Sequence, residues 1–292
     1  MNLLITGAWQ GAQEHIEEIK ALGHEVRFLQ WEKDEVDDPD WVEGIICNGL
    51  FLNHPISIFP NLRYIQLTSA GFDRVDMDYV RTHGIEIHNA KGVYSVPMAE
   101  FAVAGVLSIY KKLPTFYRQQ HRHLWQKHRD LRELSGKQVL IVGCGDVGRE
   151  CAKRFKAFGC RVTGVNRTVR PLEWFDDVAP LSLLEEMLPT ADVVIVSIAL
   201  TDQTRGIVKA SRLKEDAVLV NISRGDTVDL EGVRAAVLDA FSEEPLPEES
   251  PLWDNEIILL TPHNSFAGEG NGERLWKVVH NNVQNHEKGE IT

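Results

Sequence analysis

The stretch that decides the fold is QVLIVGCGDVGRECAKRFKAFGCRVTGVN, residues 138–166. Its first part, QVLIVG, is an apolar run that predicts a buried strand. The part DVGRECAKRFKAFG predicts a helix that ends at Gly159, a typical helix stop, and RVTGVN predicts a second strand. Together they form one strand–helix–strand unit, which is typical of a parallel α/β sheet.

Three glycines occupy the turn between the first strand and the helix. Gly143, Gly145 and Gly148 have GxGxxG spacing, with Asp146 and Val147 before the third glycine. The first glycine permits the sharp bend, the second lets a pyrophosphate approach the backbone, and the third lets helix and strand pack closely. The helix N-terminus then faces the phosphate charge. A purely structural glycine turn is the alternative, but the strand–turn–helix context predicts a dinucleotide site at these five residues.

The end of the second strand indicates which dinucleotide is bound. A fold that prefers NAD places a carboxylate here, on the ribose hydroxyls of the adenosine. This chain has the neutral Asn166 instead, followed by Arg167, Thr168 and Arg170. Guanidinium groups attract the 2′-phosphate of NADP, so we expect NADP as the preferred cofactor. NAD is the alternative if the two arginines are simply solvated in a variable loop.

The alternation of strands and helices extends to both sides of this stretch. Apolar runs such as NLLIT, GIICN and LRYIQL precede it, and ADVVIVSIA and AVLVNIS follow it. Residues 95–134, between the two blocks, predict a long helical segment that breaks at Pro114 and bridges two domains. We therefore predict an α/β protein with two doubly wound parallel sheets.

Composition and charge argue against several classes of function. The 292 residues suffice for two domains, and the net charge of -12 argues against nucleic acid or an anionic membrane as a partner. The chain starts without a basic leader, and its longest apolar run, Val193–Leu200, is too short to span a membrane. We expect a cytoplasmic protein that acts on a small molecule.

No metal site is expected, since the four cysteines form no CxxC pair. The histidine-rich part of the bridging segment, residues 111–132, raises an alternative, because His121, His123 and His128 could hold a metal or a phosphate. No acidic or cysteine ligand stands at matching spacing, so a solvated arm or a contact between subunits is the preferred interpretation.

Three polar residues outside the glycine turn suit acid–base chemistry. Arg224 follows AVLVNIS at the end of a predicted buried strand, a ligand-facing position, although it could also pair on the surface with Asp226 or Asp229. His263 lies in LLTPHNSF, and Glu244 lies in an acidic loop. A lone histidine is more often structural, but a carboxylate beside it favours the imidazolium, which can act as a general acid. An arginine can polarise a carbonyl, and the three together suit hydride transfer from a nicotinamide.

Five motifs in the same order resemble the D-isomer-specific 2-hydroxyacid dehydrogenase family. They are TSAGFDRVD (68–76), LSGKQVLIVGCGDVG (134–148), NISRGDTVD (221–229), LDAFSEEPLPEESPLW (238–253) and TPHNSF (261–266). The resemblance covers nearly the whole chain. It implies a Rossmann cofactor domain, residues 96–265, inserted in a flavodoxin-like substrate domain, residues 1–95 plus 266–292. It also implies a homodimer that forms through the arm 111–132.

The resemblance also implies a role for each matching residue. Arg224 would orient a 2-oxo acid, His263 would be the acid–base group, and Glu244 would be its partner. Asp239 would bind the nicotinamide carboxamide.

A short turn would bind the carboxylate of the substrate. The resemblance implies that Ser69, Ala70 and Gly71 hold this carboxylate through their backbone amides, as an anion-binding nest does. From the residues alone, an ordinary strand-to-helix turn is the alternative.

The chain departs from the family pattern after Arg224. The interval between this arginine and LDAF is shorter by roughly nine residues, which is more than two helical turns. Either the crossover is truly shortened, or a segment is missing from the chain. A shortened crossover beside the arginine puts activity in doubt, because catalytic geometry tolerates little displacement.

The preferred functional hypothesis is an oxidoreductase that transfers a hydride between NADP(H) and a small 2-oxo or D-2-hydroxy acid of the glyoxylate or hydroxypyruvate type. A 3-phosphoglycerate dehydrogenase is the second candidate within the family. A dinucleotide-sensing binding protein with little turnover is the candidate from another class, since a fold does not fix a function.

Overall fold

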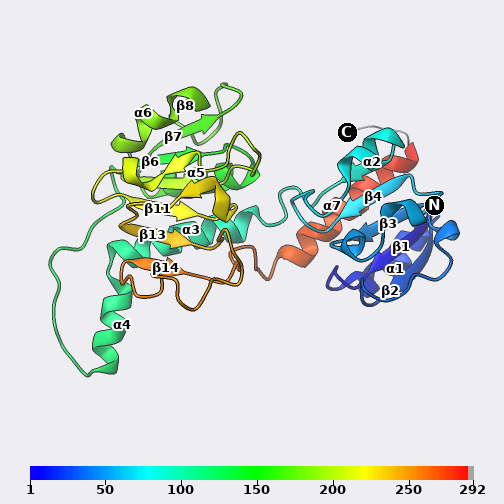
Figure 1. Ribbon diagram of the computed structural model, residues 1–292, viewed down its shortest axis with the longest axis horizontal. Helices are drawn as coiled ribbons and strands as arrows, with labels where there is room; N and C mark the ends of the chain where they lie inside the picture. The colour runs from blue at the N-terminus through cyan, green and yellow to red at the C-terminus, as the bar shows by residue number, and fades with distance from the viewer. Residues whose placement is uncertain (289–292) are drawn as a thin grey trace. The chain divides into compact units, whose positions relative to one another are not determined.

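The computed structural model describes residues 1–288, which fold into two compact units (Figure 1). Unit 1 comprises Met1–Tyr94 and Gly268–Thr292, and unit 2 comprises Ser95–Ala267. Unit 2 is therefore inserted into the chain of unit 1.

Unit 1 is built on a five-stranded parallel sheet with the order β2-β1-β3-β4-β5. Its strands are β1 (Asn2–Thr6), β2 (Glu25–Leu29), β3 (Gly44–Cys47), β4 (Tyr64–Leu67) and β5 (Glu86–His88). Its helices are α1 (Ala12–Ala21), α2 (Met77–Thr82) and α7 (Asn271–Lys288), with short 3-10 turns η1 (Pro39–Trp41), η2 (Leu50–Leu52) and η3 (Ile56–Ile58).

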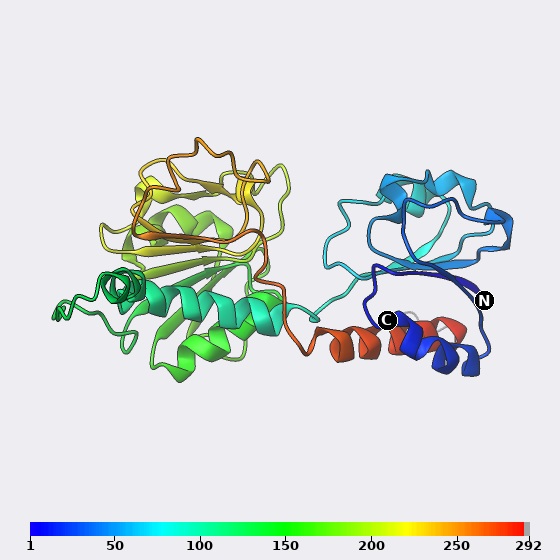
Figure 2. The ribbon, with the colours of Figure 1, turned by 90° about the horizontal axis from the view of Figure 1, so that it is seen from below.

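Helices cover both faces of the unit 1 sheet. Alternate residues of a strand point to opposite faces, so Leu3 and Ile5 join one core while Leu4 joins the other. α1 and α7 pack on the first face (Figure 2), and α2 contributes Val80 to the second. The C-terminal helix thus completes the core of a unit that begins at the N-terminus.

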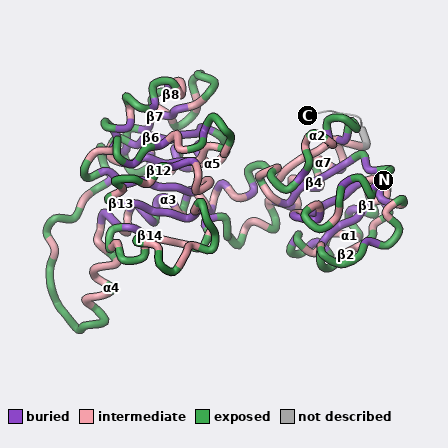
Figure 3. The backbone as a smooth tube through the Cα atoms, in the orientation of Figure 1, coloured by how far each residue is buried: buried purple, intermediate pink, exposed green. Residues whose placement is uncertain are grey.

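Unit 2 is built on a seven-stranded parallel sheet with the order β14-β13-β11-β9-β6-β7-β8. These strands are β6 (Gln138–Val142), β7 (Arg161–Asn166), β8 (Asp177–Pro180), β9 (Val193–Val196), β11 (Val218–Asn221), β13 (Ala235–Leu238) and β14 (Ile258–Leu260). β10 (Val208–Lys209) and β12 (Val228–Asp229) form a separate pair. The central strands of both sheets are almost entirely buried (Figure 3), whereas the edge strands β2 and β5 of the unit 1 sheet contain no buried residue.

The two faces of the unit 2 sheet are covered differently. α3 (Ser95–Tyr110) and α5 (Asp146–Ala157) pack on one face (Figure 2), where a Cβ at Gly105 of α3 would lie 2.7 Å from the methyl groups of Val237. The other face is covered by α6 (Leu184–Met187), by 3-10 turns, and by Val208 and Val228 of the β10–β12 pair. These turns are η4 (Leu181–Leu183), η5 (Leu188–Thr190), η6 (Ala210–Arg212) and η7 (Gly225–Thr227).

The crossover from β11 to β13 is short for neighbouring parallel strands, which are usually joined through an α-helix. Residues 222–234 contain η7 and β12 but no α-helix. The two strands nevertheless pair along all four residues, from Val218 with Ala235 to Asn221 with Leu238. The short interval noted in the sequence is therefore accommodated without loss of strand pairing.

The bridging segment is less helical than its sequence predicts. α3 ends at Tyr110, Lys112 has a left-handed backbone with φ of 53°, and α4 (Leu113–His121) starts next to it. The expected helix beyond His121 is wrong, because residues 124–134 form no regular element. In Figure 1, α4 extends away from the sheet of unit 2 and a long loop returns from it. Arg132 anchors that return, with its guanidinium carbon over the ring of Tyr110, 4.1 Å from the ring centroid.

The predicted architecture, an α/β fold with two parallel sheets, is confirmed. No helix within residues 1–288 is long and apolar enough to cross a bilayer. Over the same residues, no cluster of three or more histidine, cysteine, aspartate or glutamate side chains is arranged to hold a metal ion. The four cysteines are free thiols, and all are buried.

Candidate active site

The glycine turn joins β6 to α5 at the carboxyl edge of the unit 2 sheet. Gly143 has φ of 98°, and a Cβ there would lie 2.8 Å from the backbone of Ile198. A Cβ at Gly148 would lie 2.1 Å from the carbonyl oxygen of Gly143, so only glycine permits this packing. No atom lies within 4 Å of the Cβ position of Gly145, which caps the N-terminus of α5. The open backbone beside a helix N-terminus fits the pyrophosphate of a dinucleotide.

Ser197 fixes this turn from the neighbouring strand. It follows β9, and its Oγ donates to the carbonyl oxygen of Gly143 at 2.8 Å. Ser197 was not predicted from the sequence, although a polar residue directly after the apolar run VVIV is a signal for such a position. The turn residues Asp146 and Val147 are both half-buried, and Val147 packs against the core under α5.

The end of β7 presents polar and cationic groups to solvent. Asn166 is half-buried, and its Nδ2 donates to the carbonyl oxygen of Thr168 at 3.2 Å. Arg167, Thr168 and Arg170 are all exposed. The loop therefore carries no carboxylate at the end of the strand, and its guanidinium groups are accessible to an anion.

Arg224, Glu244 and His263 follow three neighbouring strands of one sheet. Arg224 comes after β11, Glu244 after β13, and His263 after β14, and these strands pair in that order. Because parallel strands end at the same edge, the three residues belong to one loop cluster. The carbonyl oxygen of Arg224 accepts hydrogen bonds from Asn221 and Thr227, which fix the turn that carries its side chain.

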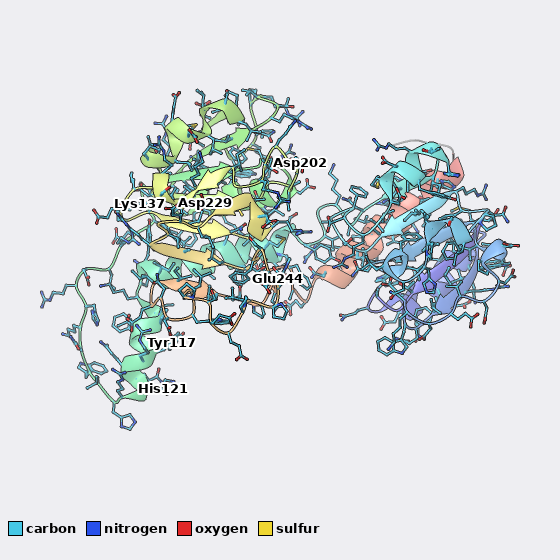
Figure 4. All side chains as sticks on the ribbon, in the orientation of Figure 1. Tyr117, His121, Lys137, Asp202, Asp229 and Glu244 are labelled. Carbon is cyan, nitrogen blue, oxygen red and sulfur yellow. The ribbon has the colours of Figure 1, made fainter. Side chains whose placement is uncertain are left out.

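Glu244 and His263 are in direct contact. Nδ1 of His263 lies 2.8 Å from Oε2 and 3.1 Å from Oε1 of Glu244. The backbone amide of Phe241 donates to Oε1 of Glu244 at 2.9 Å and holds the carboxylate in place. Both side chains remain partly accessible, with exposed fractions of 39% for His263 and 37% for Glu244. Figure 4 shows Glu244 on the loops of unit 2.

The turn after Arg224 presses against the loop that carries Glu244. A Cβ at Gly225 would lie 2.0 Å from the carbonyl carbon of Phe241 and 2.2 Å from the amide nitrogen of Ser242. Next to it, hydrogen bonds from Ser242 and from Arg205 hold the pKa of Asp226 below its usual range. Asp226 therefore pairs with Arg205 and Ser242, and the short crossover is fastened to the edge of the sheet.

Asp239 lies at the end of β13, and its carboxylate is turned into the protein. The residue is 1% exposed. Its Oδ1 accepts from the hydroxyl of Thr261 at 2.7 Å and from the amide of Asn264 at 2.8 Å, and its Oδ2 accepts from the amide of Ser265 at 2.9 Å. The sequence did not predict these three bonds to the loop around His263.

The turn expected to bind a carboxylate follows β4 in unit 1. All three of its carbonyl oxygens accept hydrogen bonds. That of Ser69 accepts from the amide of Ala90, that of Ala70 from the side chain of Asn89, and that of Gly71 from the hydroxyl of Ser69. These bonds fix the turn from the inside, which is compatible with amides that face an anion.

Known proteins resemble this chain in sequence and in fold. A family model described as D-isomer specific 2-hydroxyacid dehydrogenase, NAD binding domain, matches residues 103–265. A glyoxylate/hydroxypyruvate reductase of Arabidopsis thaliana is 31% identical over 248 residues, which cover 78% of this chain and 74% of the relative.

Solved structures agree over the full length. A D-isomer specific 2-hydroxyacid dehydrogenase family protein from Aeromonas salmonicida has a TM-score of 0.85 and 28% identity, covering 99% of this chain and 97% of that one. A D-isomer specific 2-hydroxyacid dehydrogenase from Xanthobacter autotrophicus, in complex with NADPH and MES, has a TM-score of 0.80 and 28% identity, covering 100% and 96%. The chain belongs to the D-isomer specific 2-hydroxyacid dehydrogenase family of NAD(P)-dependent oxidoreductases.

Proposed function

We propose that the protein is an NADP(H)-dependent reductase of small 2-oxo acids of the glyoxylate or hydroxypyruvate type. The observation that carries the proposal is the contact between His263 and Glu244, 2.8 Å long, at the sheet edge that also carries Arg224. This set provides a proton donor, a carboxylate that favours the charged donor, and a cation for the substrate.

The contact with Glu244 determines which imidazole nitrogen can act. Nδ1 faces the carboxylate, so Nε2 is the nitrogen left to give a proton to the carbonyl oxygen of the substrate. A dinucleotide whose pyrophosphate is held at the glycine turn would supply the hydride to the carbonyl carbon from its nicotinamide ring. The carbonyl thereby becomes a hydroxyl, and Glu244 stabilises the imidazolium before the proton is given up.

Two kinds of group are suited to bind the carboxylate of a 2-oxo acid. Arg224 would pair with the carboxylate and polarise the carbonyl, because a guanidinium offers several donors in a fixed plane. In unit 1, which we propose as the substrate domain, the turn Ser69–Gly71 would present backbone amides to a carboxylate. In unit 2 we propose the cofactor site at Gly143, Gly145, Asp146, Val147 and Gly148, with Asp239 near the carboxamide.

The preference for NADP over NAD is supported by the end of β7. Asn166 replaces the carboxylate that would repel a 2′-phosphate, and Arg167 and Arg170 are exposed beside it. The relative from Xanthobacter autotrophicus was crystallised with NADPH, which supports the same choice.

The proposal is tested by steady-state assays of the purified full chain. Glyoxylate, hydroxypyruvate, pyruvate and 3-phosphohydroxypyruvate are each offered with NADPH and with NADH. We expect the highest kcat/KM for one of the unphosphorylated acids with NADPH. A preference for the phosphorylated acid would indicate a 3-phosphoglycerate dehydrogenase instead. Binding of NADPH without oxidation by any of these acids would contradict catalysis and favour a dinucleotide-sensing protein.

A further inference from the structure

A cavity lies beside the short crossover that joins β11 to β13. Parallel strands are usually connected through a helix that packs on the sheet, but residues 222–234 form no α-helix. The end of this crossover, residues 232–235, forms one wall of the cavity, and residues 210–217, which begin with η6, form the other. The cavity has a volume of about 210 Å³. The dinucleotide and acid–base chemistry proposed above does not use it.

The inner surface of this cavity is apolar. Leu213 and Val233 pack on the core of the sheet face that α6 and the 3-10 turns cover. Ala210, Ala217 and Ala235 are buried around them. Alanine fills little volume, so these positions leave space that larger side chains would occupy. An apolar cavity of about 150 Å³ can bind benzene, so this cavity has room for a ring and for a polar group attached to it.

Two cationic residues line the same cavity. Arg234 lies 3.6 Å from Glu215, and the two side chains are 59% and 90% exposed, so the ion pair contributes little and can exchange for another anion. Lys214 donates to Asp192 at 2.8 Å, which takes one of the three donors of its ammonium group. A guanidinium can bind a carboxylate through two parallel hydrogen bonds. The charges therefore suit an acid whose apolar part enters the cavity.

We propose that this cavity binds a small carboxylic acid with an apolar body of about the size of a benzene ring. The apolar body would remove the surfaces of Leu213 and Val233 from water, which is favourable in proportion to the area buried. The carboxylate would remain at the rim, where Arg234 and Lys214 would hold it.

The proposed site is separate from the candidate active site within unit 2. Ala217 and Arg234 directly precede β11 and β13, whereas Arg224 and Glu244 come after these strands. Because both strands are parallel, the cavity and the catalytic loops lie at opposite edges of the sheet. β11 has four residues, which rise by about 13 Å, so one small acid cannot occupy both places.

Binding of benzoate to the purified full chain tests the proposal by calorimetry and ligand-observed NMR. We expect a dissociation constant of about 1 mM or lower, as for a compact ligand in a small pocket. Benzamide lacks the charge and acetate lacks the ring, so each should bind about 10-fold more weakly or worse. Saturating benzoate should also raise the melting temperature, because it binds the folded state. Absence of benzoate binding would overturn the inference.

Arg234→Ala removes the cation that would hold the carboxylate. It should raise the dissociation constant of benzoate about 10-fold, the value of a lost charge-assisted hydrogen bond. Arg212→Ala is the matched control, because Arg212 is an exposed arginine of η6 that does not line the cavity. Equal affinities of these two variants would overturn the role of Arg234.

Val233→Phe places a ring in the cavity itself. It should abolish benzoate binding with little change in the melting temperature, because the cavity has room for the ring. If this variant does not fold, the comparison of Arg234→Ala with Arg212→Ala still decides. A change of oligomeric state in Val233→Phe, measured by light scattering, would overturn the inference, since a second copy of the chain would then fill the cavity.

Arg224→Ala distinguishes the cavity from the candidate active site, where a carboxylate is also expected to bind. This variant should bind benzoate as the wild type does. Loss of binding in Arg224→Ala together with full binding in Arg234→Ala would assign the acid to the candidate active site and overturn the inference. These binding measurements require no turnover, so their outcome is independent of whether the protein reduces a 2-oxo acid.

Discussion

At the scale of single residues, the two arginines after β7 give the cofactor preference its clearest test. Arg167→Ala and Arg170→Ala should each raise the KM for NADPH by about 10-fold or more, the value of a lost charge-assisted hydrogen bond, and leave the KM for NADH nearly unchanged. Arg161→Ala is the control, because Arg161 is exposed at the opposite end of the same strand. Equal losses for both cofactors, or a wild type that prefers NADH, would contradict the assignment.

At this scale, the sequence predicts features that depend on neighbouring residues in the chain. It does not predict contacts between residues that are far apart in the sequence. The glycine spacing indicated the turn in which Gly143 and Gly148 leave no room for a Cβ, because the motif itself is local in the sequence. Ser197 was missed, since nothing near it in the sequence shows that it faces Gly143 across the sheet. The resemblance pairs Glu244 with His263, and the structure brings them into contact, but their catalytic roles stay predictions.

At the scale of elements, the short crossover between β11 and β13 requires a glycine at position 225. A Cβ there meets the backbone of Phe241 and Ser242, which cannot yield as a side chain could. Gly225→Ala should therefore displace Arg224 from its place, raise the KM for the 2-oxo acid and lower kcat by about 10- to 100-fold. NADPH binding, measured by fluorescence titration, should be unaffected.

Gly272→Ala serves as the control for that substitution. Gly272 lies in the first turn of α7, and no atom lies within 4 Å of its Cβ position. Alanine there should leave activity intact. If Gly225→Ala has the kinetics of Gly272→Ala, the contact between the two loops does not position Arg224.

A second element-scale prediction concerns the docking of α7 on unit 1. Glu86 of β5 lies between two histidines, with Oε1 2.6 Å from Nε2 of His88 and Oε2 in contact with Nδ1 of His286 on α7. Burial alone would raise the pKa of Glu86, but the hydrogen bonds from His88 and His286 outweigh it and lower the pKa. The carboxylate therefore fastens the C-terminal helix to the sheet.

The sign of this shift fixes the pH dependence. Because the folded pKa of Glu86 lies below the unfolded value, its contribution to stability is present above the unfolded pKa of about 4.3 and is lost as the pH falls through the folded pKa. Glu86→Gln should lower the free energy of unfolding by about 1 kcal/mol at pH 7 and by less below pH of about 4. Urea denaturation at both pH values measures the difference, and a constant difference would refute this account.

The elements themselves show which sequence signals were sufficient. Apolar runs predicted most of the central strands of both sheets, since a strand buried on two faces needs no alternation. β8 (Asp177–Pro180) was not predicted. The helix expected over residues 122–134 does not form, and the backbone of this stretch is instead anchored by Arg132 on Tyr110. The sequence shows that the crossover beside Arg224 is short. Only the structure shows that the close approach of Gly225 to Phe241 and Ser242 and the ion pair between Asp226 and Arg205 hold it in place.

At the scale of the whole molecule, exposed apolar side chains on and after α4 predict a homodimer. Trp125 exposes 96% of its surface, and Tyr117 (Figure 4) and Leu124 are exposed near it in the sequence. We propose that they pack against a second copy of the chain, so light scattering should show a homodimer. Trp125→Ala should raise the dimer dissociation constant by about 10-fold or more. Trp31→Ala, on unit 1, should not change it, and a monomeric wild type would contradict the proposal.

The most direct test of the central claim uses the complete protein and one substitution. His263→Ala should lower kcat for reduction of the preferred 2-oxo acid by NADPH about 10²- to 10⁴-fold, the usual contribution of a positioned acid, while NADPH still binds. His83→Ala, an exposed histidine of unit 1, should retain full activity. Turnover that survives the loss of His263 undiminished would show that this imidazole does not deliver the proton.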